Sequence, residues 1–148
     1  MKLVRGITLV EVLIVVLVLT ILASVVTPQL SRASGDARFD AMQAHLQDVR
    51  GQIRLYHTQH DGKYPSLGDF VAQMTQYTDA NGQPCPRSTD SCNLGPYLLN
   101  VPSNPYTGGN RIGDGSVGTS DWFYNAQTGA FRANHGTRNT EFDATLSQ

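Results

Sequence analysis

One apolar stretch near the N-terminus limits what this chain can fold into. Residues 7–27 form a run of 21 residues in which Glu11 is the only charged side chain. About 20 apolar residues are enough for a helix to cross the ~30 Å hydrocarbon core of a bilayer. A carboxylate inside such a helix costs about 2.5–3.5 kcal/mol of insertion free energy. We therefore expect a membrane-spanning helix in which Glu11 has a function of its own.

The charges on the two sides of this run predict its orientation. Lys2 and Arg5 precede it without an acidic neighbour, whereas the basic residues that follow it are offset by Asp36 and Asp40. Basic flanks stay on the cytoplasmic side of a membrane. We therefore expect a cytoplasmic N-terminus and a soluble domain on the opposite side. The net charge of −1 gives no electrostatic reason to expect nucleic-acid binding.

The residues that open the run carry a short motif. Gly6 is followed by Ile7-Thr8-Leu9-Val10-Glu11, about twenty apolar residues and then Pro28. This pattern resembles the N-terminus of type IV prepilins and of the pseudopilins of type II secretion. This chain departs from that pattern at Ile7, where the family usually has phenylalanine. The resemblance implies that a prepilin peptidase cuts after Gly6 and methylates the amine of Ile7. A secretory signal peptide cut after Ala23 is the alternative.

The resemblance also implies a role for Glu11. In a filament of such subunits, the carboxylate of one subunit meets the N-terminal ammonium of its neighbour. A buried charge is tolerated when a counter-charge pairs with it. The alternative is that Glu11, one turn into the helix, extends to the cytoplasmic headgroups.

Beyond Pro28 the pattern changes from wholly apolar to amphipathic. Apolar residues recur at spacings of three and four, which is one face of a helix; they are Phe39, Met42, Leu46, Val49, Ile53 and Tyr56. We expect one helix from near Ile7 to about His60. Its narrow apolar stripe predicts packing on a sheet, and a two-stranded coiled coil is the alternative.

The rest of the chain predicts a short helix and then strands. Ser66 and Asp69 approximate a capping box before an amphipathic stretch that ends near Tyr77. Residues 97–99 form a short apolar run, residues 111–112 and 117 flank a predicted hairpin turn at 113–115, and residues 122–124 and 131–133 flank a hairpin connection at 125–129. The predicted fold class is α+β: a long N-terminal helix packed on a small antiparallel sheet, which is pilin-like.

Two further features concern bonds within the predicted domain. Cys85 and Cys92, with six residues between them, predict a disulfide if the domain is exported; two reduced thiols are the alternative. Major pseudopilins often bind calcium in a loop before their last strand, and Asp114 and Asp121 are the acidic oxygen donors available here. An ordinary turn is the alternative to this calcium site, and its residue spacing does not match that of the family's loop.

The resemblance predicts a structural subunit and not an enzyme, and the sequence contains none of the common catalytic motifs. The expected organisation is a cleaved leader at residues 1–6, a transmembrane and polymerisation helix at 7–27, and a periplasmic head at 28–148. The implied partners are the prepilin peptidase, further copies of the chain, other pseudopilins and an assembly platform in the bacterial inner membrane. A type II secretion fibre is the favoured function. A type IV pilus for adhesion, motility or DNA uptake is the alternative.

Overall fold

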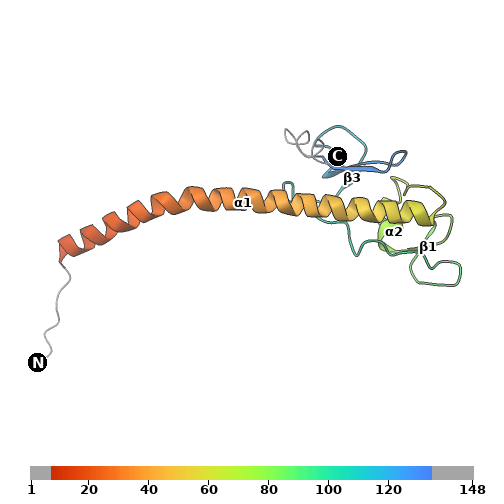
Figure 1. Ribbon diagram of the computed structural model, residues 1–148, viewed down its shortest axis with the longest axis horizontal. Coiled ribbons are helices and arrows are strands. Elements are labelled where there is room, and N and C mark those ends of the chain that lie inside the picture. Colours follow the sequence, from red (N-terminus) through yellow and green to blue (C-terminus); the bar gives the residue numbers. More distant parts are fainter. Residues whose placement is uncertain (1–7, 135–148) are drawn as a thin grey trace, which may run out of the picture. The chain divides into compact units, whose positions relative to one another are not determined.

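The chain contains one long helix, one short helix and five short strands within the residues described. The computed structural model describes the backbone of residues 8–134, and the side chains of these residues except for 25–32. The helix α1 runs from Leu9 to Gln59, through Pro28 (Figure 1). The chain divides into two compact units, Met1–Ala37 and Arg38–Gln148, which are described separately below.

The core of the second unit, called the head below, is built on the amphipathic half of α1. The predicted stripe is confirmed: Met42, Leu46, Val49, Ile53 and Tyr56 are buried, and Phe39 packs against them at the edge of the core. Aromatic residues from the C-terminal strands cover this stripe, which keeps it from water.

The main sheet has three strands in the order β3-β4-β5. These strands are β3 (Ile112–Gly113), β4 (Trp122–Asn125) and β5 (Ala130–Ala133). The hairpin predicted from residues 122–124 and 131–133 is confirmed, because β4 and β5 pair antiparallel with Tyr124 opposite Phe131. On the helix side, Arg50 Nε donates to the carbonyl oxygen of Phe131 at 2.8 Å and so joins α1 to β5.

The prediction of a wholly antiparallel sheet with a hairpin turn at 113–115 was wrong. β3 pairs with β4 in parallel, with Ile112 opposite Trp122. The cause lies at the start of both strands, where the amides of Asp121 and Trp122 both donate to the carbonyl oxygen of Arg111 at 3.0 Å. Residues 114–121 therefore return to the beginning of β3, and β4 runs in the same direction.

The apolar run at 97–99 also differs from the prediction, because it forms no strand. The amides of Tyr97 and Leu98 donate to the carbonyl oxygen of Met74 at 3.0 and 2.8 Å. Carbonyl groups at the end of a helix have no partner within it, so these two bonds satisfy an acceptor at the end of α2. Leu98 is buried by this arrangement, whereas Leu99 is left exposed.

The second helix is shorter than predicted. α2 spans Phe70–Thr75, and the chain then enters the strand β1 (Tyr77–Thr78). β1 pairs antiparallel with β2 (Pro84–Cys85), a small sheet that lies in a region predicted to be loop. Half of the expected capping box is present: the Ser66 hydroxyl accepts from the Asp69 amide at 3.2 Å, while the Ser66 amide donates to Gln73 Oε1.

Candidate functional site

The first turn of α1 holds the charged residue that the sequence singles out. Thr8 precedes the helix, and its side-chain Oγ1 accepts a hydrogen bond from the Glu11 amide at 3.2 Å. Its carbonyl oxygen accepts the first helical bond, from the Val12 amide at 3.3 Å. Thr8 is therefore the N-cap and Glu11 the third helical residue, as in a Thr-x-x-Glu capping box. A carboxylate at this position also interacts favourably with the helix dipole.

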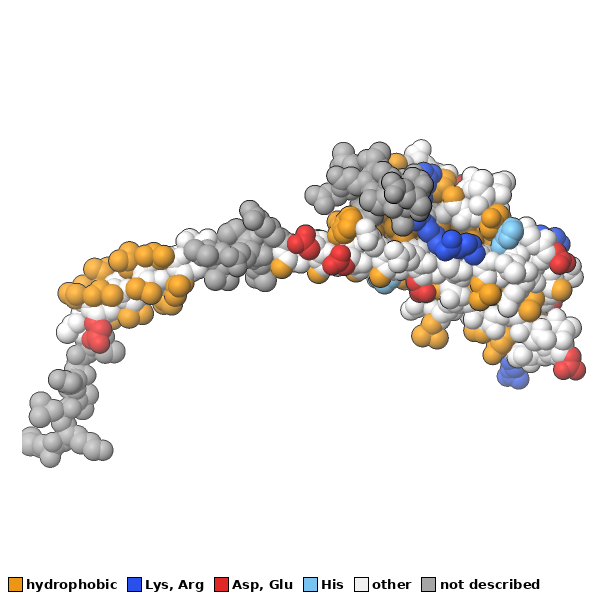
Figure 2. Space-filling model, in the orientation of Figure 1, with side chains coloured by type: hydrophobic (Ala, Val, Ile, Leu, Met, Phe, Trp, Pro, Cys, Tyr) orange, Lys and Arg blue, Asp and Glu red, His pale blue; other side chains and the backbone are white. Residues whose placement is uncertain are grey.

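Apolar side chains surround this part of α1 on every side. They are exposed in the single chain, and Figure 2 shows hydrophobic side chains gathered on the visible face of this stretch. The exposed set comprises Leu9, Val10, Val12, Leu13, Ile14, Val15, Val16, Leu17, Val18, Leu19, Ile21 and Leu22. A helix that is apolar all round is stable only when lipid or other protein covers it. This segment therefore needs a partner.

The hydroxyl groups within the apolar segment bond to the helix itself. Thr20 Oγ1 donates to the carbonyl oxygen of Leu17, and Ser24 Oγ donates to that of Ile21, both at 2.7 Å. Transfer of a hydroxyl group from water into hydrocarbon costs about 4–8 kcal/mol when the group has no hydrogen-bond partner there. These local bonds leave Glu11 as the polar side chain of the segment that requires an external explanation.

The structure covers only part of the predicted processing and anchoring segment. Gly6 and Ile7, the predicted cleavage and methylation positions, lie outside the described residues. Within residues 8–134, none of the helices combines the length and the apolarity that crossing a bilayer requires.

Asp121, one of the two predicted calcium ligands, is buried and contacts Arg111. Its Oδ2 accepts from the Arg111 amide at 2.9 Å and from Arg111 Nε at 3.3 Å. The Thr107 hydroxyl, together with these bonds from Arg111, lowers the pKa of the Asp121 carboxyl, although burial opposes the shift. The carboxylate therefore stays ionised and fixes the start of β3.

Asp114, the other predicted ligand, is exposed on the connection between β3 and β4. Among the described residues, no group of three or more histidine, cysteine, aspartate or glutamate side chains is placed to hold a metal ion. In the structure, the Asp121 carboxylate holds the backbone amide of Arg111 in place. The cation beside it is the guanidinium group of Arg111.

Cys85 and Cys92 form a disulfide in the structure. The bond closes a loop between β2 and the segment that leads to β3. Within this loop Thr89 and Cys92 exchange two backbone hydrogen bonds of 3.0 and 3.1 Å. The loop is therefore held both covalently and by its own backbone.

The role of Thr8 as the N-cap of α1 was not predicted from the sequence. Its role as the cap of α1 is encoded in the Thr-x-x-Glu spacing of Thr8 and Glu11, which is a known start signal for helices. The role expected for Glu11 from the sequence rests on its charge. The capping geometry supplies a second reason for a carboxylate at this position.

Comparison with known proteins gives two matches and one negative result. Residues 1–27 match the family model described as the prokaryotic N-terminal methylation motif. The chain is 29% identical over 69 residues to the ComG operon protein 3 homolog of Bacillus licheniformis, a match that spans 47% of this chain and 71% of that protein. No solved structure matches the chain. The chain therefore carries the prepilin-type N-terminal methylation motif that type IV pilin-like proteins share.

Proposed function

We propose that this chain is a structural subunit of a filament, a pseudopilin that polymerises into a periplasmic fibre of a type II protein secretion system. The observation that carries the proposal is the exposed apolar surface of α1 between Leu9 and Leu22, which contains one charged side chain, Glu11. Such a surface has no use in a lone soluble domain. It suits a helix that lies in lipid before assembly and against other copies afterwards.

Processing is the first step of the proposed function. A prepilin peptidase cuts between Gly6 and Ile7 and methylates the new amine, as the N-terminal motif implies. Cleavage removes Lys2 and Arg5 and creates an ammonium group four residues before Glu11. The mature chain then carries one positive and one negative charge at the start of an apolar helix.

Assembly is the second step, and it uses these two charges. The carboxylate of Glu11 pairs with the ammonium group of a neighbouring subunit, which sets the axial position of one helix against the next. Burial of an unpaired charge costs several kcal/mol, so a helix that enters the filament out of register is rejected. The apolar side chains around α1 supply contact area, and the charge pair supplies specificity.

Before assembly, the same segment anchors the subunit in the bacterial inner membrane. The supporting observation is the run of 21 residues from 7 to 27, with basic residues on the side expected to be cytoplasmic. The head then lies in the periplasm, where a disulfide such as Cys85–Cys92 is chemically stable. An inner-membrane assembly platform moves subunits from lipid into the fibre.

A type IV pilus is the competing function, since its subunits share the N-terminal features. Pilins commonly carry a disulfide near the C-terminus. Here the Cys85–Cys92 bond joins β2 to the segment that follows it, well before the β4–β5 hairpin. This position favours the secretion fibre.

The test combines the mature N-terminus with a charge-neutral variant. Mass spectrometry of the chain from its native host is expected to find N-methylated Ile7; a start at Ser24 or a retained Met1 overturns the proposal. Glu11→Gln keeps the capping box, because glutamine serves as well as glutamate there, but removes the charge. We expect Glu11→Gln to enter the membrane normally and to yield no sedimentable fibres.

The matched control is Asp90→Asn, which removes one exposed carboxylate from the disulfide loop and is expected to leave fibres unchanged. Normal fibres from Glu11→Gln would show that Glu11 acts by capping α1 and not by pairing with a neighbour. Secretion and pilus functions are separated in the host by deleting the gene and measuring protein export alongside surface pili.

A further inference from the structure

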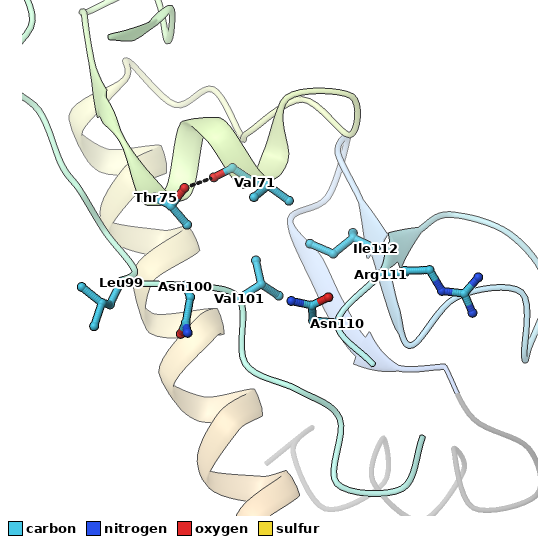
Figure 3. Close-up of a pocket in the computed structure, with 8 residues that line it drawn as sticks. All are labelled: Val71, Thr75, Leu99, Asn100, Val101, Asn110, Arg111 and Ile112. Carbon is cyan, nitrogen blue, oxygen red and sulfur yellow. Dashed lines mark hydrogen bonds between the residues drawn. The ribbon is translucent and has the colours of Figure 1, made fainter. Parts of the chain in front are cut away.

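A groove in the second unit is formed by three segments that lie far apart in the sequence. It has a volume of about 380 Å³ and lies between α2, residues 99–101 and the start of β3. Figure 3 shows Val71, Val101 and Ile112 pointing toward its middle, while Leu99 and Arg111 point outward on opposite sides. The floor of the groove is therefore mainly apolar, with Asn110 beside Val101 and Ile112, and a cation lies at one rim.

Two of the apolar side chains around this groove are unusually accessible. Leu99 is 97% exposed and Val71 is 53% exposed. Burial of a leucine or valine side chain stabilises a protein by about 1.5–3 kcal/mol. Apolar residues that gather at the surface beside a groove commonly mark a binding site.

We propose that this groove binds the C-terminal segment of the same chain, residues 141–146, which lie outside the described residues. Apolar and polar residues alternate strictly there, in the order Glu141-Phe142-Asp143-Ala144-Thr145-Leu146. Alternate side chains of an extended chain point to opposite sides. Phe142, Ala144 and Leu146 then face the apolar floor, and the two carboxylates point away from it to the solvent side, where the exposed Arg111 side chain can reach them.

The described part of the chain ends close enough to the groove for this contact. Three residues form one row across the sheet, because Trp122 of β4 lies opposite Ile112 of β3 on one side and Ala133 of β5 on the other. Neighbouring strands are about 4.8 Å apart, so Ala133 lies about 10 Å from Ile112. Residues 135–140 can span about 20 Å when extended. The connection is therefore long enough to reach past β3 into the groove.

Charge supports the choice of this segment as the occupant. The Arg111 side chain is 73% exposed and donates through Nε to Asp121 at 3.3 Å. An arginine has five N–H donors in all, so Arg111 can also bind a carboxylate of the segment. An ion pair at an exposed rim contributes only about 0–1 kcal/mol. The apolar contacts therefore supply most of the binding, and Arg111 fixes the register.

Hydrogen exchange of the full chain in detergent micelles tests the proposal, which does not depend on the filament function. We expect the amides of residues 142–146 to exchange about tenfold or more slowly relative to an unstructured peptide. Phe142→Asp and Leu99→Asp should each abolish this protection. Because Leu99 is almost fully exposed, Leu99→Asp leaves the fold of the head intact.

Two controls match these variants in charge and position. Thr145→Asp changes the opposite side of the segment, and Val117→Asp changes an exposed apolar residue away from the groove; both should retain protection. Exchange of 142–146 at unstructured rates in the parent chain overturns the proposal. Protection that survives both Phe142→Asp and Leu99→Asp also overturns it, as does protection that increases with protein concentration, since the occupant would then be a second copy.

Discussion

The two halves of α1 are both rich in apolar residues, but they differ in how these residues are distributed and covered. From Leu9 to Leu22 apolar side chains occupy every side of the helix and are exposed. From Met42 to Tyr56 they occupy one face and are buried. The same secondary structure therefore serves two different environments.

The difference shows what each half requires. A narrow stripe is covered within the chain, by residues of α2, β4 and β5. An all-round apolar surface cannot be covered by a head of this size, so it requires lipid or further subunits. The stripe of the second half is covered within the single chain, whereas the exposed apolar surface of the first half is left for another partner to cover.

The sharpest test of this comparison is a matched pair of leucine substitutions. Leu46 is 0% exposed and Leu17 is 59% exposed. Leu46→Ala leaves a cavity in the core and is expected to destabilise the head by about 2–5 kcal/mol. Leu17→Ala should change head stability by less than about 0.5 kcal/mol.

The fluorescence of Trp122 reports this stability, since it is the one tryptophan of the chain and is buried in the head. Urea unfolding of both variants in detergent micelles gives the two free energies of unfolding. A loss of head stability in Leu17→Ala equal to that in Leu46→Ala would break the comparison.

We expect the disulfide to stabilise the head but not the N-terminal half of α1. Cys85→Ser combined with Cys92→Ser removes the bond, and loop closure of this length predicts a loss of about 2–3 kcal/mol. Unfolding followed by Trp122 fluorescence, with and without reductant, measures the effect. The double variant serves as its own control because reductant should not alter it. If reductant does not lower the free energy of unfolding of the parent chain, the expectation is contradicted.

Asp121 predicts acid sensitivity of the head. Its pKa is lowered in the folded chain, so its contribution is complete above the unfolded value of about 3.9 and is lost as the pH falls through the lower folded value. Asp121→Asn removes a charged acceptor and is expected to cost about 1.5–3 kcal/mol at pH 7.

Thermal unfolding between about pH 2 and 7 checks this prediction. The parent should lose more stability below about pH 4 than Asp121→Asn does, because the variant has no carboxylate to protonate at this position. Asp114→Asn is the control, since Asp114 is exposed. Parallel pH profiles of the parent and Asp121→Asn would show that the contacts with Arg111 do not stabilise the head.

The smallest expected effect lies at the start of α1. Thr8→Ala removes the N-cap and is expected to cost about 1 kcal/mol, or about fivefold faster exchange of the Glu11 amide. Thr8→Ser retains the cap and should behave as the parent chain does. Thr20→Ala, which removes a hydroxyl within the helix, should leave the Glu11 amide unchanged. Equal exchange in Thr8→Ala and the parent would rule out the cap.

Local patterns predicted the elements whose bonds are local. The stripe from Phe39 to Tyr56 repeats with the period of a helix, and residues on that face became the core. The β4–β5 hairpin was predicted by two short runs, 122–124 and 131–133, on either side of a connection that contains Gly129, whose φ of 69° suits glycine in a tight turn.

Long-range bonds decided what the patterns left open or predicted wrongly. The direction of β3 follows from the hydrogen bonds that the Asp121 and Trp122 amides donate to the Arg111 carbonyl oxygen, and nothing in the local sequence specifies that pairing. Likewise, residues 97–99 have the composition of a strand, but the end of α2 uses the amides of Tyr97 and Leu98.

The sequence by itself determined the apolar N-terminal segment: the run from 7 to 27, its single charge at Glu11 and the Thr-x-x-Glu spacing of Thr8 can all be read from one continuous stretch of residues. Only the tertiary structure decided the head's sheet topology and the groove beside Leu99, because three separate segments must meet to form that groove. Helical periodicity is set by neighbours in sequence, whereas strand direction and surface shape depend on contacts between distant residues.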